Sequence, residues 1–177
     1  MNKDMKTIPL FKDKYAFLSN FFSSPFDWNG KYWPTVEHAY QASKAKHPQD
    51  QYRIQSAISP AVASKMGREV VIQEDWEKVK VPIMTELVWA KFDQNSELMN
   101  KLMDTGSAEL IEGNYWHDNF WGDCYCKNCI GQKGKNMLGF ILMMIRRDML
   151  AALRPSPLNK EQKLREAVFF YIEAKKA

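Results

Sequence analysis

The sequence predicts a mainly α-helical fold with minor short strands, an α+β domain whose core is built chiefly from helices. Three observations support this. Apolar residues recur at helical spacing in several segments bounded by typical capping residues. Segments with strand character are only two or three residues long. The composition, with 45% hydrophobic and 26% charged residues in 177, is that of a globular chain long enough to bury one core.

Five helices are predicted from caps and apolar periodicity. Thr35 is a typical N-cap for the first, and Ser59 followed by Pro60 is a typical start for the second, which ends at Gly67. Pro82 is expected to open the third, and the fifth is apolar on nearly every face, which places it at the centre of the core. The expected ranges are 36–46, 60–67, 82–92, 96–103 and 136–150, with short strands at 15–17, 70–72 and 110–111.

Residues 151–177 are predicted to form an extension to a domain that occupies residues 11–150. Pro155 and Pro157 disfavour a continuous helix between the two parts. Beyond the prolines an apolar stripe predicts an amphipathic helix. We interpret it as a helix docked on the domain surface, with a membrane or nucleic-acid arm as the alternative. The stripe consists of Leu164, Ala167, Val168, Tyr171 and Ile172.

Most of the net charge of +4 lies in that extension. Residues 1–150 hold 19 basic and 18 acidic side chains, whereas residues 151–177 hold six and three. This distribution is unlike that of a basic nucleic-acid-binding domain. Because the sequence shows no apolar signal segment and no run that could cross a bilayer, we expect a cytoplasmic protein with no membrane partner. The sequence leaves the oligomeric state open.

A polar face on the first predicted helix is one candidate for chemistry. Glu37, Gln41 and Lys44 follow one another at i, i+4 and i+7, so a helix places them on the same side. A carboxylate, an amide and an ammonium in a row could hold a polar, anionic substrate. The same pattern also fits an ordinary solvated face, and both interpretations stay open at this point.

A second candidate is the segment 112–123, rich in aromatic, amide and carboxylate side chains between two glycines. We expect a loop there, and loops carry binding residues more often than cores do. Aromatic faces such as that of Trp121 can stack on a purine-like ring. A loop packed by its own aromatic rings is the alternative. Asp118 and Trp121 are the residues of greatest interest.

The cysteines allow two interpretations. Cys124, Cys126 and Cys129 form a C-x-C-x2-C cluster that with His117 would make a Cys3His zinc set. A second C-x2-C pair, usual in structural zinc sites, is absent from the sequence, so we favour reduced, unliganded thiols and expect no metal.

A glycine-rich turn, residues 131–139, leads into the last core helix. Backbone N–H groups at that helix start could receive a phosphate, helped by Lys133 or Lys135. The segment matches neither a P-loop nor a Rossmann dinucleotide motif. Asn136 at the turn could instead simply cap the helix.

Taken together and in order, these segments resemble the NADAR family of YbiA-like proteins. The resemblance covers residues 11–150 and rests on the ordered combination rather than on any one motif. The motifs are FLSNFF at 17–22, VEHAYQASK at 36–44, MGR at 66–68, KF at 91–92, LMDTG at 102–106, LIE at 110–112, DNFWG at 118–122 and GKNMLG at 134–139.

The resemblance implies N-glycoside hydrolysis without a cofactor or metal. YbiA-like members cleave the ribose–nitrogen bond of early, phosphorylated ribosylamino-pyrimidine intermediates of riboflavin biosynthesis. Related members remove ADP-ribose from modified guanine in DNA or nucleosides, which is the alternative; nucleic acid would then be a partner only as an ADP-ribosylated substrate. A non-catalytic ADP-ribose or NAD-binding module is the alternative of another class. Carried over by motif, the catalytic residues are Glu37 and Asp118, and the substrate-binding residues are Asn20, Lys44, Arg68, Trp121 and Asn136.

The residue chemistry is consistent with that implication. Cleavage of an N-glycosidic bond builds positive charge on the sugar, and carboxylates beside it can stabilise the charge or activate water. Which carboxylate is the base stays open, with Glu37 favoured as the central one. Residues 123–133 depart from the family pattern, since they are longer than usual and contain the cysteines. This departure bears on substrate choice, because the segment could border the pocket.

Overall fold

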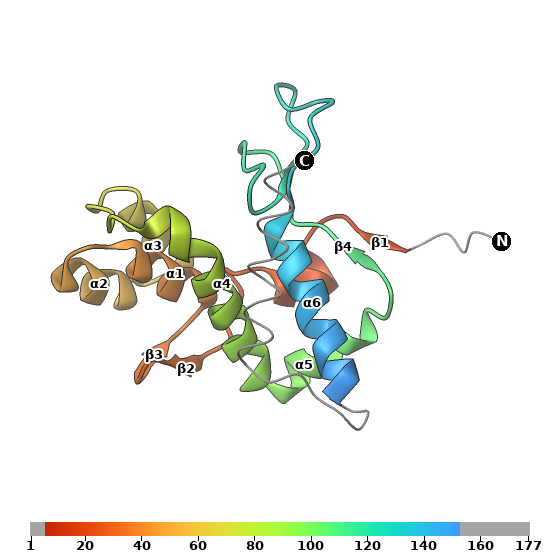
Figure 1. The fold of residues 1–177 in the computed structure, drawn as a ribbon, viewed down its shortest axis with the longest axis horizontal. Helices are drawn as coiled ribbons and strands as arrows, with labels where there is room; N and C mark the ends of the chain where they lie inside the picture. Colours follow the sequence, from red (N-terminus) through yellow and green to blue (C-terminus); the bar gives the residue numbers. More distant parts are fainter. Residues whose placement is uncertain (1–5, 153–177) are drawn as a thin grey trace. The chain divides into compact units, whose positions relative to one another are not determined.

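The structure, a computed structural model, describes residues 6–152 and is mainly helical, as the sequence predicts (Figure 1). The chain divides into two compact units. Residues 20–96 form the first, called here the 20–96 unit. Residues 6–19 and 97–152 form the described part of the second, called the terminal unit. The amphipathic helix predicted after Pro157 lies outside the described residues.

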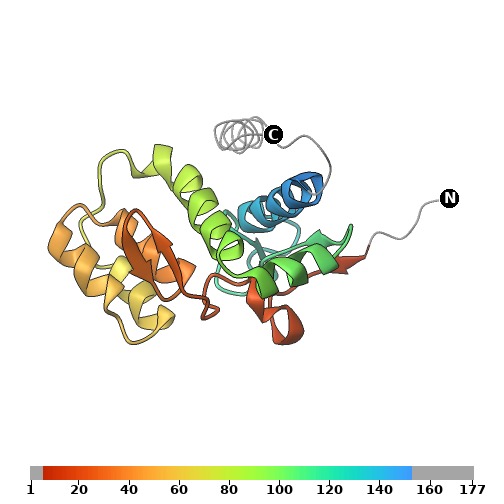
Figure 2. The ribbon, with the colours of Figure 1, turned by 90° about the horizontal axis from the view of Figure 1, so that it is seen from below.

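The 20–96 unit consists of four helices and one β-hairpin. Helix α1 contacts α2, α3 and α4, while β2 contacts α4 and β3 contacts α1 (Figure 2). Asn29 and Gly30 form the two-residue hairpin turn, both at positive φ (52° and 70°), which suits the right-handed twist of the strands. The elements are β2 (Phe26–Trp28), β3 (Lys31–Trp33), α1 (Val36–Lys44), α2 (Pro48–Gln55), α3 (Pro60–Gly67) and α4 (Trp76–Asp93).

Helix α1 is fixed at its start by Thr35. The Thr35 hydroxyl accepts the backbone N–H of His38 at 3.3 Å and lies 2.7 Å from His38 Nδ1. His38 Nε2 lies 3.1 Å from the Ala57 carbonyl, which can only accept, so Nε2 carries a proton. With that proton in place, a neutral ring can accept the Thr35 hydroxyl at Nδ1. Burial lowers the pKa of His38, in keeping with that state. His38 therefore has a structural role in joining α1 to the segment before α3.

Helix α3 confirms the predicted caps, whereas the predicted start of α4 is wrong. Ser59 accepts the Val62 N–H at 3.2 Å, Pro60 is the first helical residue, and Gly67 the last. Helix α4 begins at Trp76, not at Pro82, which lies inside the helix. Interior proline ordinarily costs about 3 kcal/mol, and the long buried side of α4 offsets that cost by packing.

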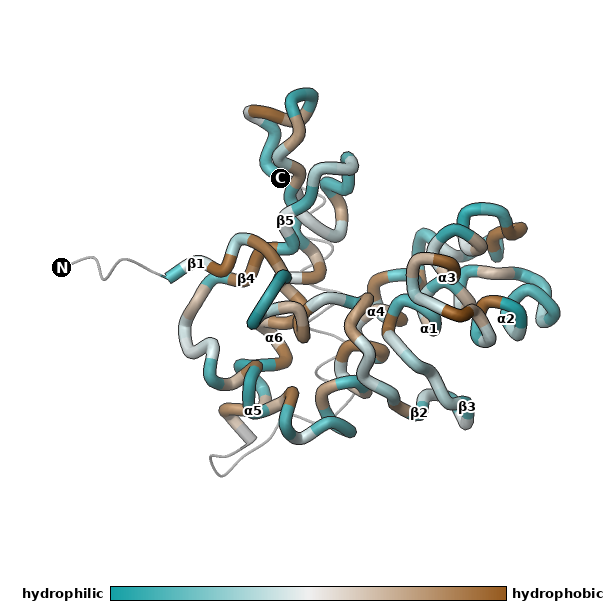
Figure 3. Tube along the Cα trace, turned by 180° about the vertical axis from the view of Figure 1, so that it is seen from behind, coloured by the Kyte–Doolittle hydropathy of each residue, from teal (hydrophilic) through white to brown (hydrophobic). Residues whose placement is uncertain are grey.

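The terminal unit packs a central helix on short strand pairs. Helix α6 contacts β4, and the predicted core position of this helix is confirmed, since Leu138, Ile141, Leu142 and Ile145 are fully buried. Brown, hydrophobic stretches recur along its trace in Figure 3. The elements are β1 (Thr7–Ile8), the 3-10 helix η1 (Asp13–Leu18), α5 (Ser96–Asp104), β4 (Glu109–Leu110), β5 (Gly113–Asn114), β6 (Asp123–Cys124) and α6 (Met137–Ala152); α5 begins at the last residue of the 20–96 unit.

The strand predictions are only partly confirmed. Strand β1 pairs with β4, and β5 with β6, both in parallel. Leu110 lies in β4 as predicted, but residues 15–17 belong to η1. Of residues 70–72 only Ile72 pairs, in an isolated bridge with Ala45. Within residues 6–152, no helix has the length and apolar character needed to span a membrane.

Candidate active site

The seven residues predicted to act on substrate divide between the two units. Four of them, including the buried carboxylate, belong to the 20–96 unit, and three belong to the terminal unit. The first set is Asn20, Glu37, Lys44 and Arg68; the second is Asp118, Trp121 and Asn136.

Glu37 is the most buried charged group of the first set. It lies in the first turn of α1 and is only 7% exposed. Gln41, one turn later, donates a hydrogen bond from Nε2 to Glu37 Oε1 at 3.0 Å, and Ser64 on α3 bonds the same carboxylate. The carbonyl oxygen of Asn20 accepts the Glu37 backbone N–H at 3.1 Å, which attaches the FLSNFF segment to this end of the helix.

The charges around Glu37 form one electrostatic group. Burial raises the pKa of Glu37, and this effect is opposed by hydrogen bonds from Gln41 and Ser64 and by the positive charges of Arg68 and Lys44. Burial lowers the pKa of Lys44, while Glu37 raises it and Arg68 lowers it. The structure therefore brings three of the predicted residues together: a desolvated carboxylate with two cations in reach of its field.

Gly67 explains how α1 and α3 approach each other at Glu37. A Cβ atom at position 67 would overlap the Gln41 side chain, lying 2.9 Å from its Cβ and closer still to Oε1. Gln41 Oε1 is buried and has no hydrogen-bond partner within residues 6–152. Beside the carboxylate there is thus a buried acceptor, packed against Gly67, for which the described residues offer no hydrogen-bond donor.

Asn20 and Lys91 are two further buried polar side chains of the 20–96 unit. Asn20 is buried, with Nδ2 3.4 Å from the sulfur of Met84. Lys91 is 1% exposed, and its ammonium lies 5.7 Å from the centre of the Phe22 ring and 5.2 Å from that of Phe92. The sequence reasoning named Lys91 only as part of a motif. Its place three residues after Val88, on the apolar side of a helix, was the signal that could have singled it out.

In the terminal unit, Asp118 organises the loop that contains it. Its Oδ1 atom accepts the backbone N–H groups of Phe120 at 3.0 Å and Trp121 at 2.8 Å. Asn114, fully buried, donates to the Asp118 carbonyl at 2.6 Å and accepts the Asp118 N–H at 3.2 Å. The sequence places Asn114 within the candidate segment 112–123 but does not single it out, because a lone asparagine carries no pattern. The ring of Trp121 stands edge-on to Phe120 at 4.9 Å and 88°.

The backbone N–H groups at the start of α6 are not available to bind a phosphate. The backbone N–H groups of residues 135–138 donate to the carbonyl oxygens of residues 119–122, at 2.8–3.1 Å. These donors are therefore used within the fold, which leaves no support for phosphate binding by them, one of the two alternatives for this segment. The loop and the helix start form one hydrogen-bonded body that holds Asp118, Trp121 and Asn136.

Asn136 itself fastens the helix start to the strand before the loop. Its Oδ1 accepts the Glu112 N–H at 2.9 Å and its Nδ2 donates to the Leu110 carbonyl at 2.8 Å. Gly139 makes room for this arrangement, because a Cβ there would lie 2.5 Å from Asn136 Nδ2 and closer to the Leu110 oxygen. The oxygen and the nitrogen of the Asn136 side-chain amide thus both have structural partners, and a contact with substrate stays a prediction.

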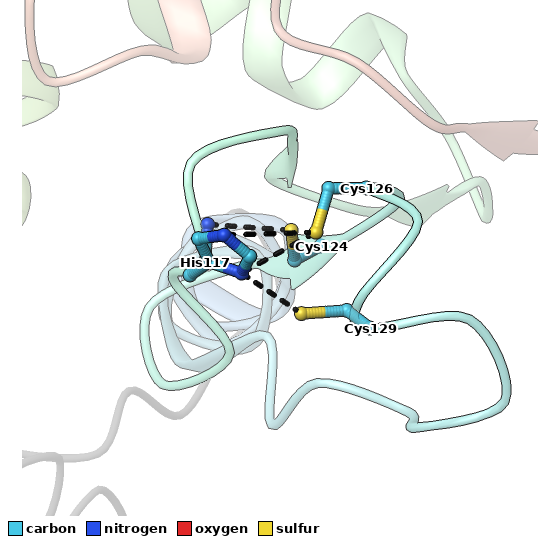
Figure 4. A group of neighbouring side chains, drawn as sticks. All are labelled: His117, Cys124, Cys126 and Cys129. Carbon is cyan, nitrogen blue, oxygen red and sulfur yellow. Dashed lines mark hydrogen bonds between the residues drawn. The ribbon is translucent and has the colours of Figure 1, made fainter.

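Two surface hollows lie apart from these residues. One, of about 240 Å³ in the 20–96 unit, is lined by Trp28, Trp33, Ser43 and their neighbours. The other, of about 490 Å³ in the terminal unit, is lined by residues from Asp123 to Lys133. Neither includes any of the seven predicted residues. The second lies beside the cysteines, whose side chains converge with His117 (Figure 4).

Comparison with known proteins agrees with the motifs. The NADAR domain model matches residues 10–150. The N-glycosidase YbiA of Escherichia coli (strain K12) is 39% identical over 140 residues, which cover 77% of this chain and 83% of that protein. An N-glycosidase of Nostoc punctiforme is 36% identical over 141 residues (76% and 86%). A riboflavin biosynthesis protein of Vibrio vulnificus is 35% identical over 139 residues (77% and 36%).

The fold agrees as well. The NMR structure of Escherichia coli YbiA superposes with a TM-score of 0.73 at 34% identity, covering 88% of this chain and 92% of that one. A family model that spans most of the chain, relatives matched over most of their length and a shared fold lead to one conclusion. This chain belongs to the NADAR family.

Proposed function

We propose that this protein is an N-glycosidase that hydrolyses the ribose–nitrogen bond of phosphorylated ribosylamino-pyrimidine intermediates of riboflavin biosynthesis. The observation that carries the proposal is Glu37, a buried carboxylate with a raised pKa, held by Gln41 and Ser64 and flanked by two cations. Relatives matched over most of their length are named N-glycosidases, and a further relative is named a riboflavin biosynthesis protein.

The reaction needs a negative charge beside the anomeric carbon. As the C1′–N bond breaks, its electron pair leaves with the base nitrogen and positive charge spreads over C1′ and the ring oxygen. Water adds its oxygen to C1′ and its protons are shared between the sugar hydroxyl and the departing amine. In its ionised form Glu37 stabilises the developing charge, and it does so strongly because it is shielded from solvent. Gln41 holds the carboxylate in one orientation.

Lys44 and Arg68 are proposed to bind the 5′-phosphate of the substrate. Both lie within the electrostatic reach of Glu37, from the last turn of α1 and the end of α3. Arg68 is exposed and offers a planar, bidentate donor suited to phosphate. Asn20, attached to the start of α1, is proposed to contact the substrate from the same unit.

Roles in the terminal unit are proposed residue by residue. Asp118 uses one carboxylate oxygen for the turn at 120–121, and we assign its carboxylate to water activation or charge stabilisation. Trp121 is proposed to stack on the base. Asn136 is proposed to support this loop and contact the substrate. The three cysteines form no disulfide, which suits a reducing cytoplasm, where we propose that the protein acts.

A substrate panel tests the function. Purified full chain is incubated with the two phosphorylated ribosylamino-pyrimidine intermediates and, in parallel, with ADP-ribosylated guanosine and ADP-ribosylated DNA. Release of ribose 5-phosphate from the first pair is the expected result. Release of ADP-ribose alone would contradict the substrate assignment while keeping the N-glycosidase chemistry. Folded protein that releases neither sugar would contradict both, and binding of ADP-ribose without turnover would identify a binding module.

A further inference from the structure

We propose that His117, Cys124, Cys126 and Cys129 bind one structural Zn²⁺ ion. The four ligand atoms all lie within 4.8 Å of one another, and Figure 4 shows the side chains pointing toward a common centre. The three cysteines are not joined by disulfides. This inference goes beyond the glycosidase proposal and does not depend on it.

The distances fit a tetrahedral ion. Zinc bonds of about 2.3 Å to sulfur and about 2.0 Å to nitrogen place a histidine nitrogen about 3.5 Å from each cysteine sulfur. In the structure His117 Nδ1 lies 3.4 Å from Cys129 Sγ and 3.3 Å from Cys126 Sγ. Its Nε2 lies 4.0 Å from Cys126 Sγ, so Nδ1 is the nitrogen that faces the sulfurs. These two nitrogen-to-sulfur distances thus already match those of a tetrahedral zinc site.

Neighbouring N–H groups are arranged as donors to thiolates. The backbone N–H of His117 donates to Cys124 Sγ at 3.3 Å, and the side chain of Asn119 donates to Cys129 Sγ at 3.3 Å. Asn119 also accepts the backbone N–H of Cys124 at 2.9 Å, which fixes its orientation. Donors of this kind stabilise sulfur in the anionic form that binds a metal, and they orient the ligands.

The segment that contains the four ligands has few buried side chains of its own. Within residues 115–135, all described, the only buried side chains are those of Cys124 and Cys129. Of the large apolar side chains there, Phe120 and Trp121 are half-buried, and the others are exposed: Tyr115, Trp116, Tyr125 and Ile130. A 21-residue segment without an apolar core needs another source of order, and a metal ion commonly supplies it in small structural elements.

The ligands also bracket the DNFWG motif. Residues 118–122 lie between His117 and Cys124, so a bound ion would close the loop that contains Asp118 and Trp121. The C-x2-C part forms a tight turn, with the Cys129 N–H bonded to the Cys126 carbonyl at 3.0 Å. At neutral pH, binding converts three thiols to thiolates and releases their protons, and the complex of one Zn²⁺ with three thiolates and a neutral imidazole carries a net charge of −1.

Metal content tests the proposal directly. The full chain, expressed with zinc in the medium and purified without chelators, is expected to contain about one zinc per chain by elemental analysis. The Cys126→Ser/Cys129→Ser variant is expected to contain under about 0.1. Asn128→Ser, between the same two cysteines, is the matched control and is expected to keep the full content. A chelator should lower the Tm of the wild type and leave that of the double variant unchanged.

A second measurement, on the wild type alone, tests the proposal even if the double variant fails to fold. Wild-type protein stripped of metal and titrated with Co²⁺ should develop the thiolate-to-cobalt and visible bands of a tetrahedral sulfur-rich site, saturating at one ion per chain. Under about 0.1 zinc in the wild type, with no cobalt bands, overturns the proposal. Stoichiometric iron, or zinc that persists in the double variant, overturns it equally, because the ion or its ligands would then differ from those assigned.

Discussion

At the scale of residues, the central feature is a carboxylate that the fold holds against its preference for water. Glu37 keeps one hydrogen bond from its own helix and one from α3, yet burial remains the largest influence on its pKa. An ionisable group buried in this way is typical of a catalytic site, and ionising it costs stability of the folded chain.

The effect of pH on stability follows from the direction of that shift. Because the folded pKa of Glu37 lies above its ordinary value of 4.5, folding favours the protonated form. The associated stability is fully present below pH 4.5 and is lost as the pH rises through the folded pKa. Glu37→Gln mimics the protonated group and does not titrate. The difference in Tm between Glu37→Gln and the wild type should therefore grow in favour of the variant from pH 4 to pH 8.

Thermal unfolding followed at several pH values measures this difference. Glu97→Gln, an exposed position on α5, provides the control and should show no such trend. The burial argument would be contradicted if the Tm of the wild type, relative to that of Glu37→Gln, were higher at pH 8 than at pH 4.

The proposed phosphate contact of Arg68 predicts a change in selectivity. Arg68→Ala should lower kcat/KM for the phosphorylated substrate about 10- to 100-fold, the range for losing hydrogen bonds to a charged group. The dephosphorylated substrate should lose at most about 2-fold, because it lacks the group that Arg68 binds. Lys65→Ala, also exposed on α3, is the matched control. Equal losses on both substrates would show that Arg68 acts on something other than the phosphate.

Sequence reasoning reached some of these residues and missed others for physical reasons. The i, i+7 spacing of Glu37 and Lys44 fixes them on one helix face, so their proximity could be predicted. The approach of Arg68 depends on how α3 packs on α1, which no local pattern encodes. Asn114 and Lys91 were included only as members of longer segments, because their importance lies in burial and polar residues are ordinarily exposed.

At the scale of elements, the approach of α1 and α3 depends on the missing side chain at Gly67. Replacing a helical glycine by alanine ordinarily stabilises a helix by about 0.5–1 kcal/mol. Here the added Cβ would displace Gln41 and with it the partner of Glu37. Gly67→Ala should lower Tm and lower kcat/KM about 10- to 100-fold, because small misplacements of catalytic groups are costly.

A double-mutant cycle identifies the cause. If the clash with Gln41 is responsible, Gly67→Ala/Gln41→Ala should be more stable than the sum of the two single effects predicts. Strict additivity, or a Gly67→Ala variant as stable and active as the wild type, would rule out the packing argument.

The elements that the sequence predicted well are those with local signals. Ser59, Pro60 and Gly67 mark both ends of α3, and the structure has the helix between them. Helix α2 was missed because only Ile54 is buried along it, so no apolar stripe appears in the sequence. The start of α4 was misplaced because proline ordinarily begins helices, and tertiary packing here keeps Pro82 in the interior.

At the scale of the whole molecule, net charge does not account for the selection of the phosphorylated substrate that we propose. Residues 1–150, which nearly coincide with the NADAR match, hold 19 basic and 18 acidic side chains. Selection must therefore depend on placed cations such as Lys44 and Arg68 rather than on a general positive field. The convergence of His117 with the cysteines likewise depends on placement. The residue types can be read from the sequence, but their ligand atoms come together only in the folded loop.

One comparison tests the central claim most directly: turnover of the phosphorylated ribosylamino-pyrimidine substrate by wild type, Glu37→Gln and Glu97→Gln, each confirmed as folded by circular dichroism. Loss of the charge at Glu37 should reduce kcat about 100- to 10 000-fold, the range for a residue acting in proton transfer or charge stabilisation. Glu97→Gln should match the wild type. A folded Glu37→Gln variant within about 3-fold of the wild type would contradict the assignment of Glu37 as the catalytic carboxylate.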